Sequence, residues 1–108
     1  MVKAVEYVDG RSRSPFGDWL QSLDAMIAAK VVTAIVRMEK GNFSNAKALT
    51  GGLYEYRLMF GAGCRIYFGR DGEDLVILLA GGSKRRQSRD IEMARSRWDD
   101  YQRRKSEA

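Results

Sequence analysis

The segment Leu53–Arg70, LYEYRLMFGAGCRIYFGR, most constrains the fold, because apolar and polar residues alternate on both sides of a glycine-rich turn. Alternation with a period of two is typical of a half-buried β-hairpin. A three-residue loop at 61–63 places Leu58 opposite Ile66 and gathers the apolar side chains on one face. A two-residue loop would mix apolar and charged residues on both faces. We therefore predict a hairpin with the three-residue loop.

The other face of this hairpin collects charged and hydroxyl side chains. It gathers Glu55, Arg57, Arg65 and Tyr67, with Arg57 opposite Tyr67. Opposed residues on paired strands lie roughly 5 Å apart, so these side chains can act together. Guanidinium groups hold two phosphate oxygens at once, and a tyrosine or an arginine plane stacks on a nucleobase, so this face suits RNA. The alternative is a solvated lattice of charges without a ligand.

Helical and strand patterns surround the hairpin. Ser14 followed by Pro15 marks the start of one helix, Asp24 caps a second, and Gly41 supplies its left-handed stop. The expected strands are Lys3–Val8, Leu53–Phe60, Cys64–Gly69 and Leu75–Ala80, the last of them apolar on both faces and therefore interior. Helical spacing returns in the C-terminal segment, with Ser88 as the expected N-cap. This order of elements predicts an α+β fold.

Composition limits the chemistry. One domain, 1–108, is expected. Its single cysteine excludes an internal disulfide, and the lack of histidine excludes the usual zinc sites and histidine-based catalysis. We expect no metal and no cofactor. The net charge is +5, and nine basic against five acidic residues in 83–108 contribute +4 of it, which favours a polyanionic partner. The N-terminus lacks the apolar core of a signal peptide and no apolar run could span a bilayer, so we expect a cytoplasmic protein without a membrane partner.

Three segments together carry a family resemblance. They are the N-terminal strand, FGDWLQSLDAMIAAKVVTAIVRMEKGNF, and AKALTGGLYEYRLMFGAGCRIYFGRDGEDLVILLAGGSKRRQSRDIEMA, which together cover about Val5 to Trp98. The chain resembles the RelE/ParE toxin superfamily of toxin–antitoxin modules, and most closely its phage-derived, HigB-like (Gp49-like) addiction module killer branch. The resemblance implies a RelE-like fold: a small curved antiparallel sheet with an N-terminal helical hairpin and a C-terminal helix.

The resemblance also implies an activity, that of a ribosome-dependent endoribonuclease, or mRNA interferase, that inhibits translation. By position, the phosphate-binding arginine of the family falls on Arg65, a basic strand position on Arg57, and the lysine before the hairpin on Lys47. The basic residues after the last strand fall on Lys84, Arg85 and Arg86. Where better-known relatives place a second lysine, the chain has Glu55. Near the start of the C-terminal helix it has Ile91 in place of an aromatic or histidine acid–base group.

Metal-free RNA cleavage uses the 2′-hydroxyl to attack the adjacent phosphate. It needs a base, a proton donor to the leaving oxygen, and cations that stabilise charge on the phosphate. We expect Arg57 and Arg65 to be those cations. Glu55 is the candidate base, and Lys84 or Tyr67 is the candidate donor. The alternative is catalysis by positioning and electrostatics, with ribosomal RNA contributing groups.

Two other functions are open at the level of the sequence. A ParE-like chain would inhibit DNA gyrase by contact without cutting RNA, and a decayed toxin would only bind its antitoxin. In each case the resemblance implies a helix-turn-helix, HigA-like antitoxin from the same operon, with operator DNA bound through the antitoxin complex. The ribonuclease hypothesis adds the ribosome and mRNA as partners.

Overall fold

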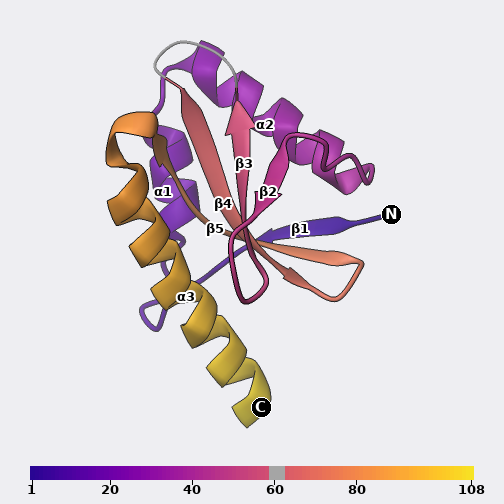
Figure 1. Cartoon of the computed structure of the whole chain (residues 1–108). Coiled ribbons are helices and arrows are strands. Elements are labelled where there is room, and N and C mark those ends of the chain that lie inside the picture. Colours follow the sequence, from indigo (N-terminus) through magenta and orange to yellow (C-terminus); the bar gives the residue numbers. More distant parts are fainter. Residues whose placement is uncertain (59–62) are drawn as a thin grey trace.

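The computed structural model describes residues 1–58 and 63–108 (Figure 1). Its strands are β1 (Lys3–Glu6), β2 (Ala46–Ala48), β3 (Leu53–Leu58), β4 (Cys64–Asp71) and β5 (Leu75–Ser83). Its helices are α1 (Pro15–Ser22), α2 (Ala25–Glu39) and α3 (Gln87–Glu107), with a short 3₁₀ helix, η1 (Lys84–Arg86), before α3. The predicted α+β fold, with a helical hairpin, a curved sheet and a C-terminal helix, is confirmed. Within the described residues, no helix is both long enough and apolar enough to cross a membrane.

The five strands form one sheet in the order β1-β5-β4-β3-β2. β5 has a strand on each side, as its two-sided apolar sequence predicts. The strands from β2 to β5 pair antiparallel, and β1 joins β5 as a parallel edge strand in which Val5 pairs with Ile77. The sheet is therefore an antiparallel meander with one parallel strand added at its edge.

The register of the β3–β4 hairpin differs from the prediction by two residues. Leu58 pairs with Cys64 and not with Ile66. A shift of two residues leaves every side chain on its predicted face, because side chains alternate with a period of two. The alternation therefore determines the faces, whereas the register depends on the turn. The predicted loop at 61–63 falls largely outside the described residues; of its residues Gly63 is described, with a left-handed φ of +81°.

The start signals of both N-terminal helices are confirmed. The Ser14 hydroxyl accepts a hydrogen bond from a backbone N–H in the first turn of α1 at 3.0 Å, and Pro15 occupies the first helical position. Asp24 Oδ1 accepts from the Ile27 N–H at 3.0 Å at the start of α2. After α2, Gly41 adopts a φ of +85°, as expected for a left-handed stop.

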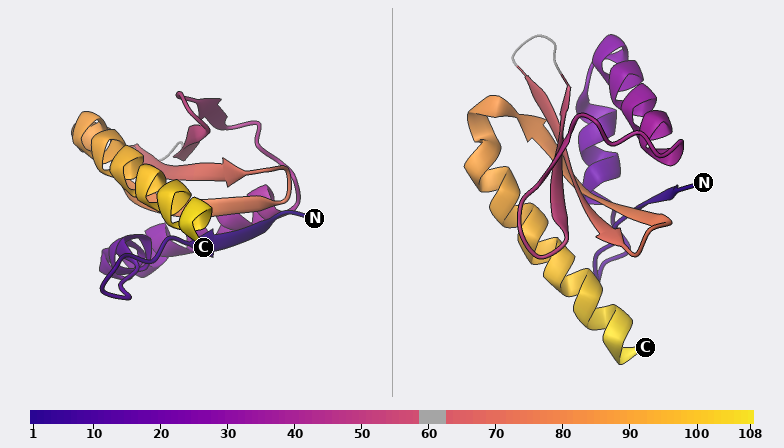
Figure 2. Two further views of the ribbon diagram at one scale, coloured as in Figure 1. Left: turned by 90° about the horizontal axis from the view of Figure 1, so that it is seen from below. Right: turned by 45° about the vertical axis from the view of Figure 1, so that its right-hand side comes forward.

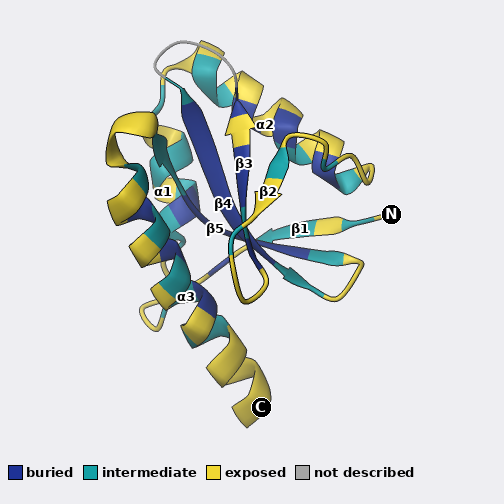
Figure 3. Cartoon of the chain, in the orientation of Figure 1, coloured by how far each residue is buried: buried dark blue, intermediate teal, exposed yellow. Residues whose placement is uncertain are grey.

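Each face of the sheet carries its own apolar core, with α1 and α2 on one side and α3 on the other (Figure 2). The first core includes Phe16, Val31, Met38, Tyr56, Ile66 and Phe68. The second includes Tyr7, Leu53, Tyr67, Leu79, Ala94 and Trp98. Figure 3 shows β4 buried along most of its length, as expected for a strand covered on both faces. The charged face of the hairpin is therefore the face on which α3 lies.

The start of α3 differs from the prediction. Ser88 is not the N-cap, because η1 follows β5 directly and α3 begins at Gln87, so that Ser88 lies inside the helix. The backbone N–H of Lys84 donates to the carbonyl oxygen of Gly63 at 3.1 Å, which ties this turn to the start of β4. A 3₁₀ turn satisfies some backbone groups at a helix start, so the side-chain cap is not needed.

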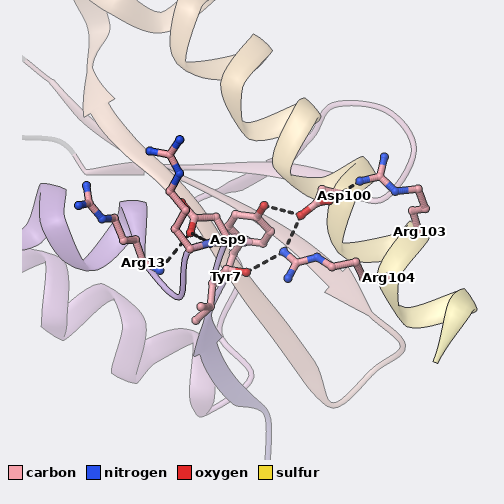
Figure 4. A network of polar contacts seen from close by, with 8 residues as sticks. Tyr7, Asp9, Arg13, Asp100, Arg103 and Arg104 are labelled. Atoms are coloured by element: carbon pink, nitrogen blue, oxygen red, sulfur yellow. Dashed lines mark hydrogen bonds and ion pairs between the residues drawn. The ribbon is translucent and has the colours of Figure 1, made fainter.

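Polar contacts fix the C-terminal half of α3 to the end of β1 (Figure 4). The hydroxyl of the buried Tyr7 donates to Asp100 Oδ2 at 2.5 Å. Arg104 Nη2 donates to the same carboxylate oxygen at 2.5 Å and to the Val8 carbonyl oxygen at 2.7 Å. Burial and the hydrogen bond to the Asp100 carboxylate raise the pKa of Tyr7 above its ordinary value. These contacts therefore join the segment that follows β1 to the C-terminal half of α3.

Tyr7→Phe should lower the free energy of unfolding by about 1 kcal/mol, because it removes one hydrogen bond and keeps the ring in the core. Urea denaturation followed by circular dichroism measures the change. Tyr54→Phe, which removes a hydroxyl on the opposite face of the sheet, is the control. Equal stability of Tyr7→Phe and the parent chain would show that the hydroxyl makes no net contribution.

Candidate functional site

A buried carboxylate organises the charged face of the sheet. The side chain of Glu55, in β3, is 1% exposed. Its Oε1 accepts a hydrogen bond from Arg57 Nε at 3.0 Å and lies 3.6 Å from Arg65 Nε. Its Oε2 accepts from Gln87 Nε2 at 2.8 Å. Burial raises the pKa of Glu55, but the hydrogen bonds from Gln87 and Arg57 and the charge of Arg65 outweigh it and leave the pKa below its ordinary value. Glu55 therefore stays ionised between two guanidinium groups.

The two arginines are exposed to different extents. Arg57 pairs with Arg65 across β3 and β4, and not with Tyr67 as predicted, because of the two-residue shift in register. The Arg57 side chain is 46% exposed, whereas that of Arg65 is 9% exposed. Glu55 thus forms ion pairs with one exposed guanidinium, that of Arg57, and with one that is largely buried, that of Arg65. This arrangement can grip an anion such as a phosphate group, as guanidinium pairs do.

Lys47 extends this face to the edge of the sheet. It pairs with Glu55, and Glu55 pairs with Tyr67, so the three residues form one row across β2, β3 and β4. Residues paired in this way point to the same face. Lys47 is exposed at the edge strand. The structure therefore brings the predicted lysine to the same face as the arginines.

Tyr67 does not fit the stacking role predicted for it. Its ring is fully buried under α3, with Leu53, Ala94 and Trp98 in the same core. The hydroxyl is buried and has no hydrogen-bond partner among the described residues, and burial together with the Glu55 carboxylate raises its pKa far above the ordinary value. Tyr67 therefore keeps its proton at neutral pH. Its buried ring lies in the core beside Glu55, with which it pairs across the strands. The sequence pattern placed it on the correct face but could not show that α3 covers it.

The predicted cations after β5 lie in η1 and are exposed; they are Lys84, Arg85 and Arg86. Gly63 separates Lys84 from the buried arginine of the cluster. A Cβ atom at Gly63 would lie 3.5 Å from Arg65 Nη1 and 3.5 Å from the Lys84 Cβ. The exposed cations of η1 therefore begin directly beside the Arg65 guanidinium.

Two polar residues at the start of α3 were missed by the sequence analysis. Gln87 contacts Glu55, and no local pattern indicates this contact. Asp90 is 8% exposed, and its buried Oδ2 has no hydrogen-bond partner in the part of the chain that the structure describes. Burial raises the pKa of Asp90 above its ordinary value, although nearby arginines oppose the shift. A signal for Asp90 was present, because it occupies the same helical stripe as Ala94 and Trp98, which both face the core.

The charged face has the chemistry of an anion site. Among the residues that the structure describes, no three His, Cys, Asp or Glu side chains gather in a way that could hold a metal ion. The groups that do gather are guanidinium and ammonium ions around one carboxylate. Such a set can bind phosphate and stabilise negative charge that develops on it.

Comparison with known proteins places the chain in a family. An uncharacterized protein of Haemophilus influenzae is 40% identical over 81 residues, which cover 74% of this chain and 82% of the relative. Residues 18–99 match the family described as "Phage derived protein Gp49-like (DUF891)". This range begins within α1, contains α2 to β5 and extends through more than half of α3, so it includes the whole charged cluster. The chain therefore belongs to the Gp49-like family of phage-derived proteins, a family associated with the toxins of toxin–antitoxin modules.

Proposed function

We propose that this chain is the toxin of a type II toxin–antitoxin module, a HigB-like member of the RelE/ParE superfamily that cleaves mRNA on the ribosome. The observation that carries the proposal is the pair of guanidinium groups of Arg57 and Arg65 held by the buried Glu55. The exposed Lys47 of β2 and the exposed cations of η1 lie on either side of this pair, so an RNA backbone can be held at several phosphates.

The reaction is the attack of a 2′-hydroxyl on the adjacent phosphate, with departure of the 5′-oxygen. Arg65 is held in place before substrate binds, so it can stabilise charge on the phosphate without reorganisation. Both oxygens of Glu55 are engaged by neighbouring side chains, which favours a role in orienting the arginines. Lys84 is the candidate donor to the leaving oxygen, because it is exposed beside the Arg65 guanidinium. Ribosomal RNA then supplies the remaining groups for proton transfer.

The proposed partner is a helix-turn-helix antitoxin from the same operon. A basic face with a net positive C-terminal segment is complementary to an acidic protein segment as well as to RNA. An antitoxin segment that covers Arg57 and the cations of η1 would block RNA binding by direct competition. The same antitoxin would bring the complex to operator DNA.

The test is a cell-free translation reaction with one reporter message, in which primer extension maps new 5′ ends. We expect cuts at codon-spaced positions when the message is translated, and intact message when ribosomes are omitted. The ribosome-free reaction is the control for contaminating nucleases. Intact message in the presence of translating ribosomes would contradict the proposal. A gyrase supercoiling assay would then distinguish a ParE-like inhibitor from a decayed toxin.

A further inference from the structure

A pocket of about 480 Å³ is lined by residues from α1, the end of β5 and the start of α3. Of the residues proposed above to bind phosphate groups, Arg86 lines this pocket, whereas Arg57 and Arg65 do not. Its walls include the apolar side chains of Trp19, Leu23, Ile27 and Met93. Its charged lining residues are Asp90, Arg86 and Arg97. The pocket therefore combines apolar walls with one acidic group and two cations.

The sheet leaves room for this pocket because β1 is short. β1 pairs with β5 only from Leu75 to Leu78, so the last residues of β5 have no strand on that side among the described residues. The Trp19 ring lies directly on Gly81, where a Cβ atom would come within 2.2 Å of the ring. One wall of the pocket is thus formed by the aromatic side chain and the flat backbone of a glycine pair.

Asp90 gives the pocket its specific chemistry. The residue is 8% exposed, its Oδ2 has no hydrogen-bond partner within residues 1–58 and 63–108, and its carboxylate lies against Gly82. Arg86, Arg89 and Arg97 lie near enough to act on the carboxylate by charge, but a buried oxygen atom without a hydrogen bond costs stability, so the position of Oδ2 calls for an explanation. An ionised carboxylate only accepts hydrogen bonds, so a ligand that satisfies it must bring N–H or O–H donors.

The pocket is continuous with the charged cluster. Gly63 lines the pocket and also lies against Arg65 Nη1, which would be 3.5 Å from a Cβ atom at that position. In the sheet, Arg65 pairs with Gly82, the residue on which the Asp90 carboxylate lies. The pocket and the Arg65 guanidinium therefore have Gly63 and Gly82 as common neighbours.

We propose that this pocket receives one nucleobase of the RNA beside the phosphate held by Arg65, and that Asp90 selects guanine there. The proposal rests on the proposed function. Apolar and aromatic walls suit the faces of a base, and an acceptor at the end of the pocket reads its edge. Guanine presents two adjacent N–H donors, on N1 and N2, which match the two oxygens of a carboxylate. Uracil presents one N–H between two carbonyl groups, so it leaves the carboxylate poorly satisfied.

Asp90→Asn tests the selection of guanine in the cell-free reaction, with messages of mixed sequence and mapped 5′ ends. We expect the parent chain to cut next to guanine at one fixed position. Asp90→Asn should reduce that preference by about tenfold, the size of discrimination that one two-point contact to a base provides, while cutting continues. Asp99→Asn, an exposed acid on the same helix, is the control and should keep the preference. The inference about the pocket would be overturned if the parent chain cut without a base preference, or if Asp90→Asn kept the preference unchanged. Either result would leave the proposed ribonuclease function standing.

A binding measurement separates the pocket from the cleavage activity. In ¹H–¹⁵N spectra of the parent chain, GMP should shift the amide signals of Gly81 and Gly82 at about tenfold lower concentration than AMP. Asp90→Asn should lose this difference, and the spectra show directly whether the variant is folded. An equal response to GMP and AMP would overturn the inference. Selective GMP binding without ribosome-dependent cuts would contradict the proposed function and leave the pocket assignment standing.

Discussion

Arg65→Ala should reduce ribosome-dependent cleavage by about 100- to 1,000-fold, the loss that follows removal of one preorganised donor to a developing anion. The Arg65 side chain is 9% exposed, and its Nε lies 3.6 Å from Glu55 Oε1 without a hydrogen bond to any described residue. Burial and the ion pair therefore restrict the guanidinium before RNA binds. The exposed Arg57 must be ordered by the substrate, which reduces its net contribution. We therefore expect a smaller loss from Arg57→Ala, and the same primer-extension assay measures both.

Two controls make this result specific. Arg65→Lys keeps the positive charge but not the two-point contact, so it should restore little activity. Arg103→Ala removes an exposed arginine near the C-terminal end of α3. This variant should cleave the message at the same rate as the parent chain. Arg65→Ala should also fold, because Glu55 keeps its hydrogen bonds from Arg57 and Gln87. A folded Arg65→Ala variant with parental activity would show that the site lies elsewhere.

The hairpin shows how far sequence patterns determine this fold. Alternation placed Glu55, Arg57, Arg65 and Tyr67 on one face correctly, since a residue can change face only if the register shifts by an odd number. The register itself was wrong by two residues, because it is set by the turn and by the strands on either side. Local capping rules succeeded at α1 and α2, where a side chain bonds a backbone N–H within one turn.

The candidate site depends on a contact that local patterns do not contain. α3 lies across the charged face, so it buries Tyr67 and Glu55 and brings Gln87 to the carboxylate. The apolar stripe on α3 indicates that the helix packs on the sheet but not on which face. Asp90 lies on that stripe, and a charged residue among core positions was the one available indication of the pocket.

Trp98 and Gly69 show the same dependence of one element on another. The Trp98 ring is 3% exposed, its Nε1 donates to the Gly51 carbonyl oxygen at 2.8 Å, and the ring stacks on Tyr101. A Cβ atom at Gly69 in β4 would lie 2.3 Å from the ring. Glycine weakens a strand interior, so its place in β4 follows from the close approach of Trp98. This contact fixes the distance between α3 and the sheet.

Trp98→Ala should lower the free energy of unfolding by about 3–5 kcal/mol, because it leaves a cavity under α3. Gly69→Ala should lower the free energy of unfolding by about 1–3 kcal/mol, because the new methyl group collides with the Trp98 ring. The double variant should cost less than the sum by at least about 1 kcal/mol, since the methyl group then occupies vacated space. Urea denaturation measures all four chains, and Gly10→Ala, where a Cβ atom meets nothing within 4 Å, is the control. If the losses of unfolding free energy from the two single substitutions simply add in the double variant, the contact between Trp98 and Gly69 does not set the position of α3. The charged cluster beneath the first turn of α3 would then not depend on Trp98.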